Sequence, residues 1–391
     1  MRYFTHMYER LLESRLKHDR HHVLLLGPRQ VGKSTLLGSF KPDVTLNLAS
    51  LATFREFVAQ PERLERELLA APSTTRTILI DEVQRVPALL DGIQAIVDAH
   101  PRRFRFLLSG SSARKLRRGH ANLLPGRIVL HHLHPLVARE LGADFNLERA
   151  LAHGTLPGIY ADRDPESRSS TLRSYVDGYL REEVQTEALV RDIGGYSRLL
   201  DLAAASSGRV VNLHALSRDA AVSYETARRY LDVLEDTLLL FRIPAWRGSD
   251  RASLVAHPKV LLFDLGVRNA ILRRPLDRPL DDERGLLLEH LVGLELRRRE
   301  GTIWPEARVH HFRTRQGAEI DFVLSVGREL WAIEVKASRR VDRRDLKGFA
   351  AFAECARKVS RRIVVFLGAR SQRIDGIEVL PIEDFLAKLP G

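Results

Sequence analysis

The sequence has a single cysteine, Cys355, among its 391 residues. One thiol excludes a disulfide within the chain and a cysteine-built zinc site, and it is typical of a protein from a reducing compartment. Long uncharged apolar runs are also missing, since none approaches the roughly 18 residues that a membrane helix needs. The charged first 22 residues carry no apolar core of a secretion signal. We therefore expect a cytoplasmic protein with no membrane segment.

Positive charge is in excess. Lysine and arginine total 62 against 50 acidic residues, which gives a net charge of +12. This balance favours a polyanionic partner, because neutralising phosphates releases counterions; the alternative is a set of solvated basic faces. The apolar fraction of 44% is that of a globular protein. The length exceeds what one hydrophobic core usually serves, so we expect several domains.

A phosphate-binding loop is the clearest motif. Residues 27–34 read Gly-Pro-Arg-Gln-Val-Gly-Lys-Ser and match G-x-x-x-x-G-K-[ST] in full, between an expected strand at 22–26 and a helix at 34–40. Such a loop cradles phosphates at a helix N-terminus. We expect Lys33 to bridge the β- and γ-phosphates of ATP and Ser34 to bind Mg²⁺. The other expected nucleotide-binding residues are Gly27, Pro28, Arg29, Gln30, Val31, Gly32 and Thr35.

A second apolar strand, expected at 77–80, ends in two carboxylates. We expect Asp81 to bind Mg²⁺ and Glu82 to orient and polarise the attacking water. The alternative for Glu82 is an acid that stabilises a helix start through the helix dipole. The spacing from the phosphate-binding loop, some fifty residues, is what makes the pair informative.

Two further residues are candidates for catalysis. Ser109 ends an expected strand at 105–109, where it could lie beside Glu82 and sense the γ-phosphate; the alternative is a helix cap. Arg127 is a candidate arginine finger that stabilises phosphoryl transfer in a neighbouring subunit, and the alternative is one more surface arginine.

Four segments in a fixed order carry a family resemblance. GPRQVGKSTLL, ILIDEVQRVP, LLSGSSARKL and LPGR together resemble the AAA+-type P-loop ATPases whose C-terminal half is a DUF4143 domain. The resemblance implies an ATPase with ATP and Mg²⁺ as cofactors and a helical lid. Residues 153–158 resemble that family's Gly-Gly-aromatic-Pro element, except at Thr155 and Leu156. With Arg127, the resemblance favours a homo-oligomer, for which a hexamer is one option.

Residues 196–243 predict three short helices followed by a strand and resemble a winged helix. Arg228 and Arg229 lie together on the third helix, expected at 223–236, where Ser223 is the expected N-cap. The functional interpretation is contact with duplex DNA through these two arginines. The alternative is a small domain that only packs between two larger ones.

The last third of the chain carries a second constellation. Asp321 and Glu334 fall in two neighbouring expected strands, with Lys336 on the same face as Glu334, and Glu289 lies on a helix expected at 285–299. The three carboxylates could hold Mg²⁺, and the lysine could orient water against a phosphodiester. This order resembles the PD-(D/E)XK nuclease core, a fold that also occurs in proteins that only bind.

The sequence therefore predicts an α/β protein with four parts. These are a P-loop AAA+-type ATPase core at 1–134, a helical lid at 135–194, a winged helix at 195–250 and a restriction-endonuclease-like domain at 251–391. The leading function is ATP hydrolysis coupled to remodelling or processing DNA. One alternative is an ATP-driven signalling or defence switch that binds a protein partner, with a non-catalytic nuclease-like domain. The other is an ATP-gated, metal-dependent DNA nuclease.

Overall fold

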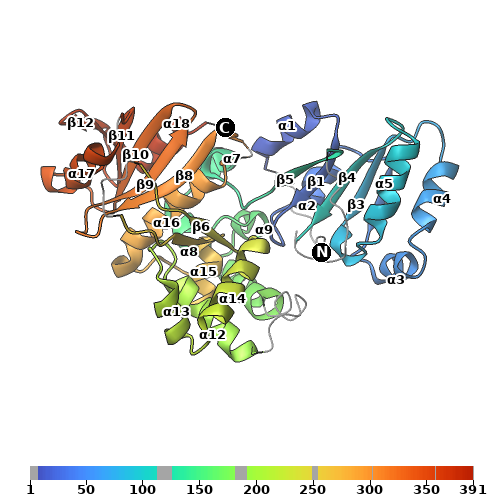
Figure 1. The fold of residues 1–391 in the computed structure, drawn as a ribbon, viewed down its shortest axis with the longest axis horizontal. Helices are drawn as coiled ribbons and strands as arrows, with labels where there is room; N and C mark the ends of the chain where they lie inside the picture. The colour runs from blue at the N-terminus through green and yellow to red at the C-terminus, as the bar shows by residue number, and fades with distance from the viewer. Residues whose placement is uncertain are drawn as a thin grey trace. The chain divides into compact units, whose positions relative to one another are not determined.

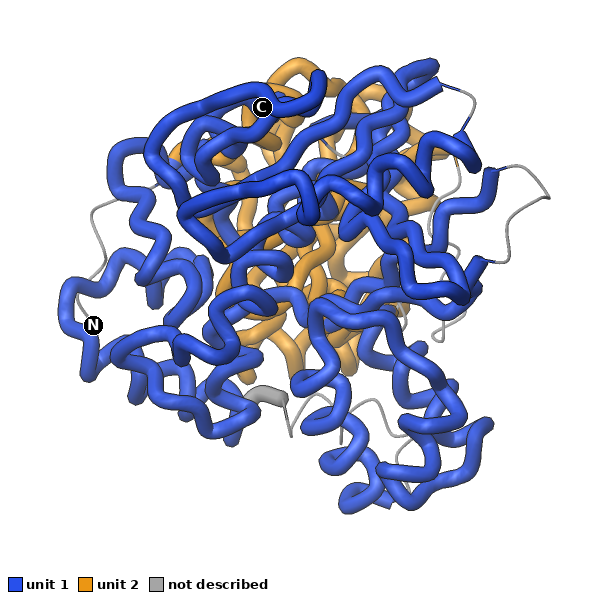
Figure 2. The backbone as a smooth tube through the Cα atoms, turned by 90° about the vertical axis from the view of Figure 1, so that its left-hand side faces the viewer, with its two compact units in different colours: residues 1–8, 135–235, 240–391 blue, residues 9–134, 236–239 orange. Residues whose placement is uncertain are grey.

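The computed structural model describes residues 8–111, 126–180, 192–248, 254–301, 303–356 and 358–390. The chain divides into two compact units, which Figure 2 shows in different colours. Unit 1 comprises residues 1–8, 135–235 and 240–391, and unit 2 comprises residues 9–134 and 236–239. The division after residue 134 falls where we expected the ATPase core to end. The return of residues 236–239 to unit 2 was not expected.

Unit 2 is built on a five-stranded, all-parallel sheet in the order β2-β3-β4-β1-β5 (Figure 1). The strands are β1 (His22–Leu26), β2 (Val44–Asn47), β3 (Thr77–Asp81), β4 (Arg105–Gly110) and β5 (Ile128–His132). In β1, β3 and β4 every residue after the first is buried, as expected for strands covered by helices on both faces. The predicted parallel α/β sheet is confirmed. Its parallel register brings the carboxyl ends of β1, β3 and β4 to one edge.

Helices cover this sheet and complete its core. They are α1 (Leu11–His18), α2 (Lys33–Gly38), α3 (Leu51–Ala59), α4 (Arg63–Ala70) and α5 (Leu89–Ala99), with a 3₁₀ turn at Val83–Arg85. Phe57, Leu64 and Ile93 from α3, α4 and α5 are buried in one cluster with strand residues such as Phe106. Leu238, from the returning segment, packs against the same cluster.

Unit 1 begins with short helices, α7 (Ala138–Leu141), α8 (Leu147–His153), α9 (Pro157–Ala161) and α10 (Pro165–Ser174), followed by a π-helical segment at Tyr175–Leu180. Three helices follow, α12 (Ile193–Ala205), α13 (Leu213–Asp219) and α14 (Tyr224–Asp236), close to their predicted positions. Ser223 Oγ accepts the Thr226 N–H at 3.1 Å, the N-cap role expected of it. An antiparallel pair, β6 (Leu240–Ile243) and β7 (Lys259–Leu262), and α15 (Leu265–Ile271) come next.

The rest of unit 1 is a mixed six-stranded sheet in the order β12-β13-β11-β10-β9-β8 (Figure 1). Its strands are β8 (Ala307–Arg313), β9 (Glu319–Val326), β10 (Glu329–Lys336), β11 (Arg361–Phe366), β12 (Gln372–Ile374) and β13 (Ile377–Pro381). The associated helices are α16 (Arg284–Arg297), α17 (Lys347–Cys355) and α18 (Ile382–Lys388). Phe349 and Phe352 of α17 are buried against strand residues. No helix in the part of the chain that the structure describes is long and apolar enough to cross a membrane.

Candidate functional site

The phosphate-binding loop joins β1 to α2, as predicted. Gln30 and Gly32 have φ angles of 65° and 92°, in the left-handed region, and a curled backbone of this kind forms an anion-binding concavity from its N–H groups. Gly27 is required for another reason: a Cβ there would lie 2.2 Å from the carbonyl oxygen of Leu133. Gly32 is therefore required by its left-handed backbone conformation, and Gly27 by the lack of room for a side chain.

Lys33 is held inside this loop. The side chain is buried, and its Nζ donates to the carbonyl oxygens of Gly27 at 2.9 Å and Pro28 at 3.0 Å. These carbonyls place a positive charge within the concavity, where it complements a phosphate. Thr35, by contrast, is exposed on α2, and Arg29 is exposed at the loop's outer side.

The predicted magnesium ligands meet across 47 residues of sequence. Ser34 Oγ donates to Asp81 Oδ2 at 2.7 Å. Ser109 is fully buried, and its hydroxyl donates to the other carboxylate oxygen of Asp81 while accepting the Glu82 N–H at 3.1 Å. Ser109 therefore lies beside Glu82, as expected, and also orients Asp81. Its contact with the γ-phosphate stays a prediction.

Glu82 has a partner that sequence reasoning missed. It lies in the left-handed region with a φ of 59°, and its carboxylate accepts a hydrogen bond of 2.5 Å from Gln84 Nε2. The same amide nitrogen donates to Ser111 Oγ at 3.0 Å. A Cβ at Gly110 would approach Gln84 Oε1 to 2.8 Å, so the glycine leaves room for the amide. The only sequence signal for this role is the position of Gln84 two residues after Glu82.

Arg10 is a second missed residue of the site. It is 8% exposed, and its guanidinium donates to the carbonyl oxygens of Val31 at 2.7 Å and His134 at 2.6 Å. Arg10 thus supports the phosphate-binding loop from the start of α1. Nothing in its sequence context distinguishes it from the chain's many other arginines.

Arg127 lies at the opposite end of the sheet from the loop of its own chain. It precedes Ile128, which pairs with His22 at the start of β1, whereas the loop follows the end of that strand. Its guanidinium forms an ion pair with Asp98 at 2.6 Å. Leu124 and Pro125 of the LPGR motif, and the basic run at 114–118, lie outside the described residues.

The segment that resembles the lid motif has a structural role in unit 1. Gly154 has a φ of 68°, and a Cβ on it would come within 1.9 Å of Asp264 Oδ1. The Thr155 N–H donates to Asp264 Oδ2 at 2.8 Å, and the same carboxylate accepts N–H groups of the first turn of α15. The motif therefore anchors the turn between α8 and α9 to the N-cap of α15.

The second predicted constellation also comes together, in unit 1. Asp321 Oδ2 accepts the Val335 N–H at 2.8 Å, which joins β9 to β10. Lys336 Nζ donates to Glu334 Oε1 at 2.8 Å. Burial and then the neighbouring Asp321 raise the pKa of Glu334 to about 8, and the same two causes raise the pKa of Glu289 to about 7. Three carboxylates are thus crowded into a poorly solvated place.

A lysine that we did not predict completes this cluster. Lys259, the first residue of β7, donates its ammonium hydrogens to the Glu289 carboxylate and, at 3.1 Å, to the main-chain oxygen of Asp321. Among the described residues, no three His, Cys, Asp or Glu side chains are placed to hold one metal ion. The Lys259 ammonium lies against both the Glu289 and the Asp321 carboxylates. The predicted ligands Glu289, Asp321 and Glu334 are neighbours, but they do not converge on one point.

The arginines expected to contact DNA are accessible. Arg228 and Arg229 are both exposed on α14, and the Arg229 guanidinium lies 5.6 Å from the centroid of the Tyr230 ring. Close to the start of the same helix, the rings of His214 and Tyr224 stack at 4.4 Å between centroids. The surface combines positive charge with an aromatic pair.

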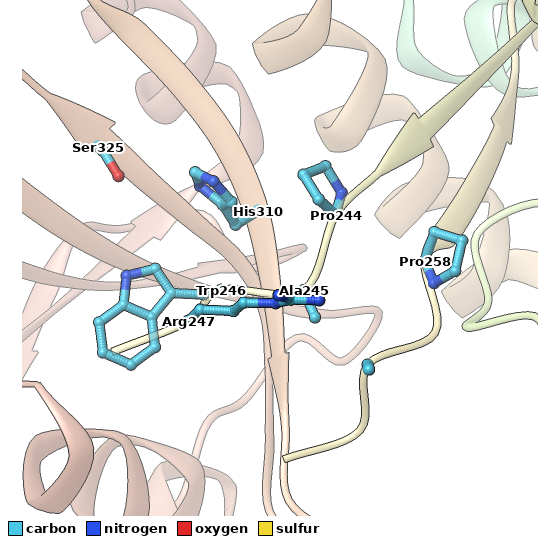
Figure 3. A pocket seen from close by; sticks show the side chains of 8 residues that line it. Pro244, Ala245, Trp246, Arg247, Pro258, His310 and Ser325 are labelled. Atoms are coloured by element: carbon cyan, nitrogen blue, oxygen red, sulfur yellow. The ribbon is translucent and has the colours of Figure 1, made fainter. Parts of the chain in front are cut away.

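A cavity of about 470 Å³ also lies in unit 1 (Figure 3). Figure 3 shows Trp246 and Arg247 on the segment after β6 and His310 on β8. Pro244, Ala245, Ala256, Pro258 and Ser325 complete its lining. This lining includes no carboxylate from the described residues, so the cavity is separate from the lysine–carboxylate cluster.

Comparison with protein families identifies three regions of the chain. Residues 19–142 match the family described as "AAA domain", residues 144–278 match a domain of unknown function, DUF8612, and residues 284–385 match the domain of unknown function DUF4143. The fold, the loop and the first match agree on an AAA-type, P-loop nucleotide-binding domain at residues 19–142. The chain therefore combines an AAA-type, ATP-binding domain with a DUF4143 domain, as the sequence resemblance implied.

Curated relatives match most of the chain. Uncharacterized proteins of Mycobacterium bovis and Mycobacterium tuberculosis are each 28% identical over 326 residues, which is 80% of this chain and 70% of theirs. Among solved structures, a variant of RuvB from Thermotoga maritima has a TM-score of 0.28 and 19% identity, covering 60% of this chain and 86% of its own. A STAND protein from Pyrococcus horikoshii has a TM-score of 0.25 and 12% identity, covering 74% of this chain and 45% of its own. Scores this low say nothing about what the chain acts on.

Proposed function

We propose that the chain hydrolyses ATP at the carboxyl edge of the unit 2 sheet. The observation that carries this proposal is the meeting of Ser34, Asp81 and Ser109 in one hydrogen-bonded group beside a phosphate-binding loop that contains Lys33. A serine hydroxyl and a carboxylate together are the oxygen ligands that magnesium takes in P-loop ATPases. The site thus fits the nucleotide and its metal.

Each residue has a distinct part in this chemistry. Lys33 neutralises phosphate charge, Ser34 and Asp81 hold the metal, and the loop N–H groups bind phosphate oxygens. When bound, magnesium neutralises charge that develops on the phosphate oxygens. Glu82 orients and polarises the attacking water. The Gln84 amide holds the Glu82 carboxylate in position through its hydrogen bond.

We also propose that unit 1 engages DNA through the surface of α14. Support comes from the net charge of +12, the two exposed arginines Arg228 and Arg229, and a succession of three helices and an antiparallel strand pair that suits a winged helix. Hydrolysis at unit 2 would then serve to remodel or process the bound DNA. Arg127, directed away from its own nucleotide site, supports action in a homo-oligomer.

The decisive experiment measures ATP turnover of the full chain with and without duplex, forked and single-stranded DNA. Wild type is expected to hydrolyse ATP, with a higher rate on at least one DNA, and Lys33→Ala is expected to lose turnover. A folded wild-type protein that neither binds nor hydrolyses ATP with Mg²⁺ would refute the ATPase assignment. Turnover without any DNA binding at modest salt would refute only the DNA role.

The same purified proteins distinguish the two alternative functions, the signalling or defence switch and the nuclease. DNA-independent turnover, together with a protein that co-purifies with the chain from cells, would favour the signalling or defence switch. Cleavage of supercoiled or linear DNA with Mg²⁺ or Mn²⁺ that disappears in Asp321→Ala would establish the nuclease. Identical products from wild type and Asp321→Ala would exclude that second site as their source.

A further inference from the structure

Lys259 is the central cation of the carboxylate cluster in unit 1. Its side chain is buried, and its Nζ lies 3.8 Å from Asp321 Oδ1 in addition to the hydrogen bonds that it donates to Glu289 and to the Asp321 main chain. The ring of Phe322 lies on another side, with its centroid 4.7 Å from the ammonium. Carboxylates, a carbonyl oxygen and an aromatic face therefore all converge on one positive charge, as a buried ammonium requires.

The carboxylate oxygens of Asp321 and of its neighbour Glu334 are already engaged within the chain. Asp321 uses Oδ2 for the Val335 N–H, and Glu334 uses Oε1 for Lys336 and Oε2 for the Asp321 N–H at 3.4 Å. A magnesium ion needs about six oxygen ligands near 2.1 Å in octahedral geometry. Supplying it here would mean breaking several of these bonds and placing a divalent charge beside Lys259.

Lys259 also lowers the negative charge that the cluster offers to a divalent cation. With all groups ionised, Glu289, Asp321 and Glu334 carry three negative charges, and Lys259 and Lys336 return two. A second cation at this site would meet strong repulsion from the ammonium that it must displace or approach closely. Without Lys259, three carboxylates would face one lysine, and the remaining two negative charges would match the charge of a divalent cation.

We propose that Lys259 is a built-in counter-ion that occupies the place of the metal, so that the wild-type cluster binds no divalent cation and holds β7, α16 and β9 together instead. Lys259 is then the residue that determines whether this nuclease-like core is a metal site. The inference does not depend on ATP hydrolysis or DNA binding, and its test leaves both unaffected. It deepens the proposed alternative in which the nuclease-like domain is non-catalytic.

The test is a titration of the full chain with Mn²⁺ in the absence of nucleotide, followed by electron paramagnetic resonance. Lys259→Met removes the charge and keeps an unbranched apolar stem. It is expected to gain one Mn²⁺ site per chain, bound at least tenfold more tightly than any Mn²⁺ in wild type. The double variant Lys259→Met/Asp321→Asn is expected to lose that site. Mn²⁺ that binds near Ser34 and Asp81 does so in wild type and in every variant, so it does not contribute to the differences between them.

A second comparison needs no change at Lys259. Wild type and Asp321→Asn are expected to bind Mn²⁺ identically, because neither has a metal site at the cluster. Wild-type binding that disappears in Asp321→Asn would overturn the proposal, as would a folded Lys259→Met protein that gains no site. Should Lys259→Met fail to fold, the comparison of wild type with Asp321→Asn still decides whether the wild-type cluster binds a divalent cation, and Lys259→Gln takes the place of Lys259→Met in the titration.

Discussion

The Ser109 hydroxyl hydrogen-bonds to the Asp81 carboxylate at the end of the neighbouring strand while accepting the Glu82 N–H. One buried side chain thus fixes both acids of the nucleotide site, the first through its side chain and the second through its main chain. Because β3 and β4 are parallel and adjacent, their carboxyl ends present these groups at one edge.

Ser109→Ala is expected to weaken magnesium-dependent turnover. Without the hydroxyl, Asp81 loses the partner that orients it, and loss of such an outer partner typically lowers metal affinity or activity roughly 10- to 100-fold. The measurement is kcat and the apparent Mg²⁺ affinity at saturating ATP. Ser39→Ala is the matched control, because Ser39 also loses a hydrogen bond, to Leu36 O, but lies at the far end of α2. An unchanged Mg²⁺ dependence would contradict the positioning role.

Gly154→Ala is expected to destabilise unit 1. The new methyl group would overlap the Asp264 carboxylate and strain a left-handed backbone, so a loss of roughly 2 kcal/mol or more is expected. Gly158→Ala is the control, because a Cβ there meets no atom within 4 Å and α9 favours alanine over glycine. Urea unfolding of both variants checks the prediction, and equal midpoints would exclude it.

Replacing Arg228 and Arg229 by alanine is expected to weaken DNA binding and its dependence on salt. If each arginine contacts one phosphate, the slope of log affinity against log salt falls by about 2 in the double variant. Fluorescence anisotropy at four or more salt concentrations measures the slope. Arg373→Ala, an exposed arginine of β12 on the far edge of the second sheet, serves as the control. A parallel shift without a change of slope would place the phosphate contacts elsewhere.

The stability of wild type is expected to fall on acidification through its buried histidine His290. Burial lowers the pKa of His290 to about 3, and its Nε2 donates to the Leu262 carbonyl at 2.8 Å, which the neutral ring can do. Since the unfolded pKa is about 6.5, the unfolded chain binds more protons than the folded one between these values. The contribution of neutral His290 to the free energy of unfolding is therefore fully present above pH 6.5. It decreases as the pH falls toward 3, by at most about 1.4 kcal/mol per pH unit.

His290→Gln removes this titration. The difference in unfolding free energy between wild type and the variant is expected to shrink as the pH falls from 7 to 5, measured by chemical denaturation at each pH. A difference that stays constant over this pH range would show that the pKa of His290 is the same in the folded and the unfolded chain.

Local sequence was sufficient for the nucleotide site because its contacts are encoded in motif spacing. The strand at 22–26, the loop after it and the Asp81 that meets Ser34 were all predictable, since a loop at the end of one buried strand must lie beside the end of another. The helices α12 to α14 were likewise evident from their apolar period. No comparable signal marks β12, β13 or α18, which follow residue 371.

Long-range polar partners were not predictable. Lys259 opens an apolar run and looks like a solvated charge at a strand start, yet it contacts residues 30 and 62 positions away. Arg10 reaches His134 across 124 residues. Such contacts depend on how helices and strands that are distant in sequence pack together. The hydrophobic period and the secondary-structure propensity of a segment carry no information about that packing. Thr155 is one of the two positions at which residues 153–158 depart from the lid motif, and its partner Asp264 lies in a different segment of unit 1.

The return of residues 236–239 to unit 2 affects how the protein can be synthesised and dissected. Leu238 covers part of the core formed by residues 24–108, yet it leaves the ribosome more than 120 residues later. Unit 2 therefore completes this part of its core during translation only after all of α14 has been made. A fragment that stops at residue 134 lacks the Leu238 contact, and appending residues 236–239 to it is expected to raise its stability.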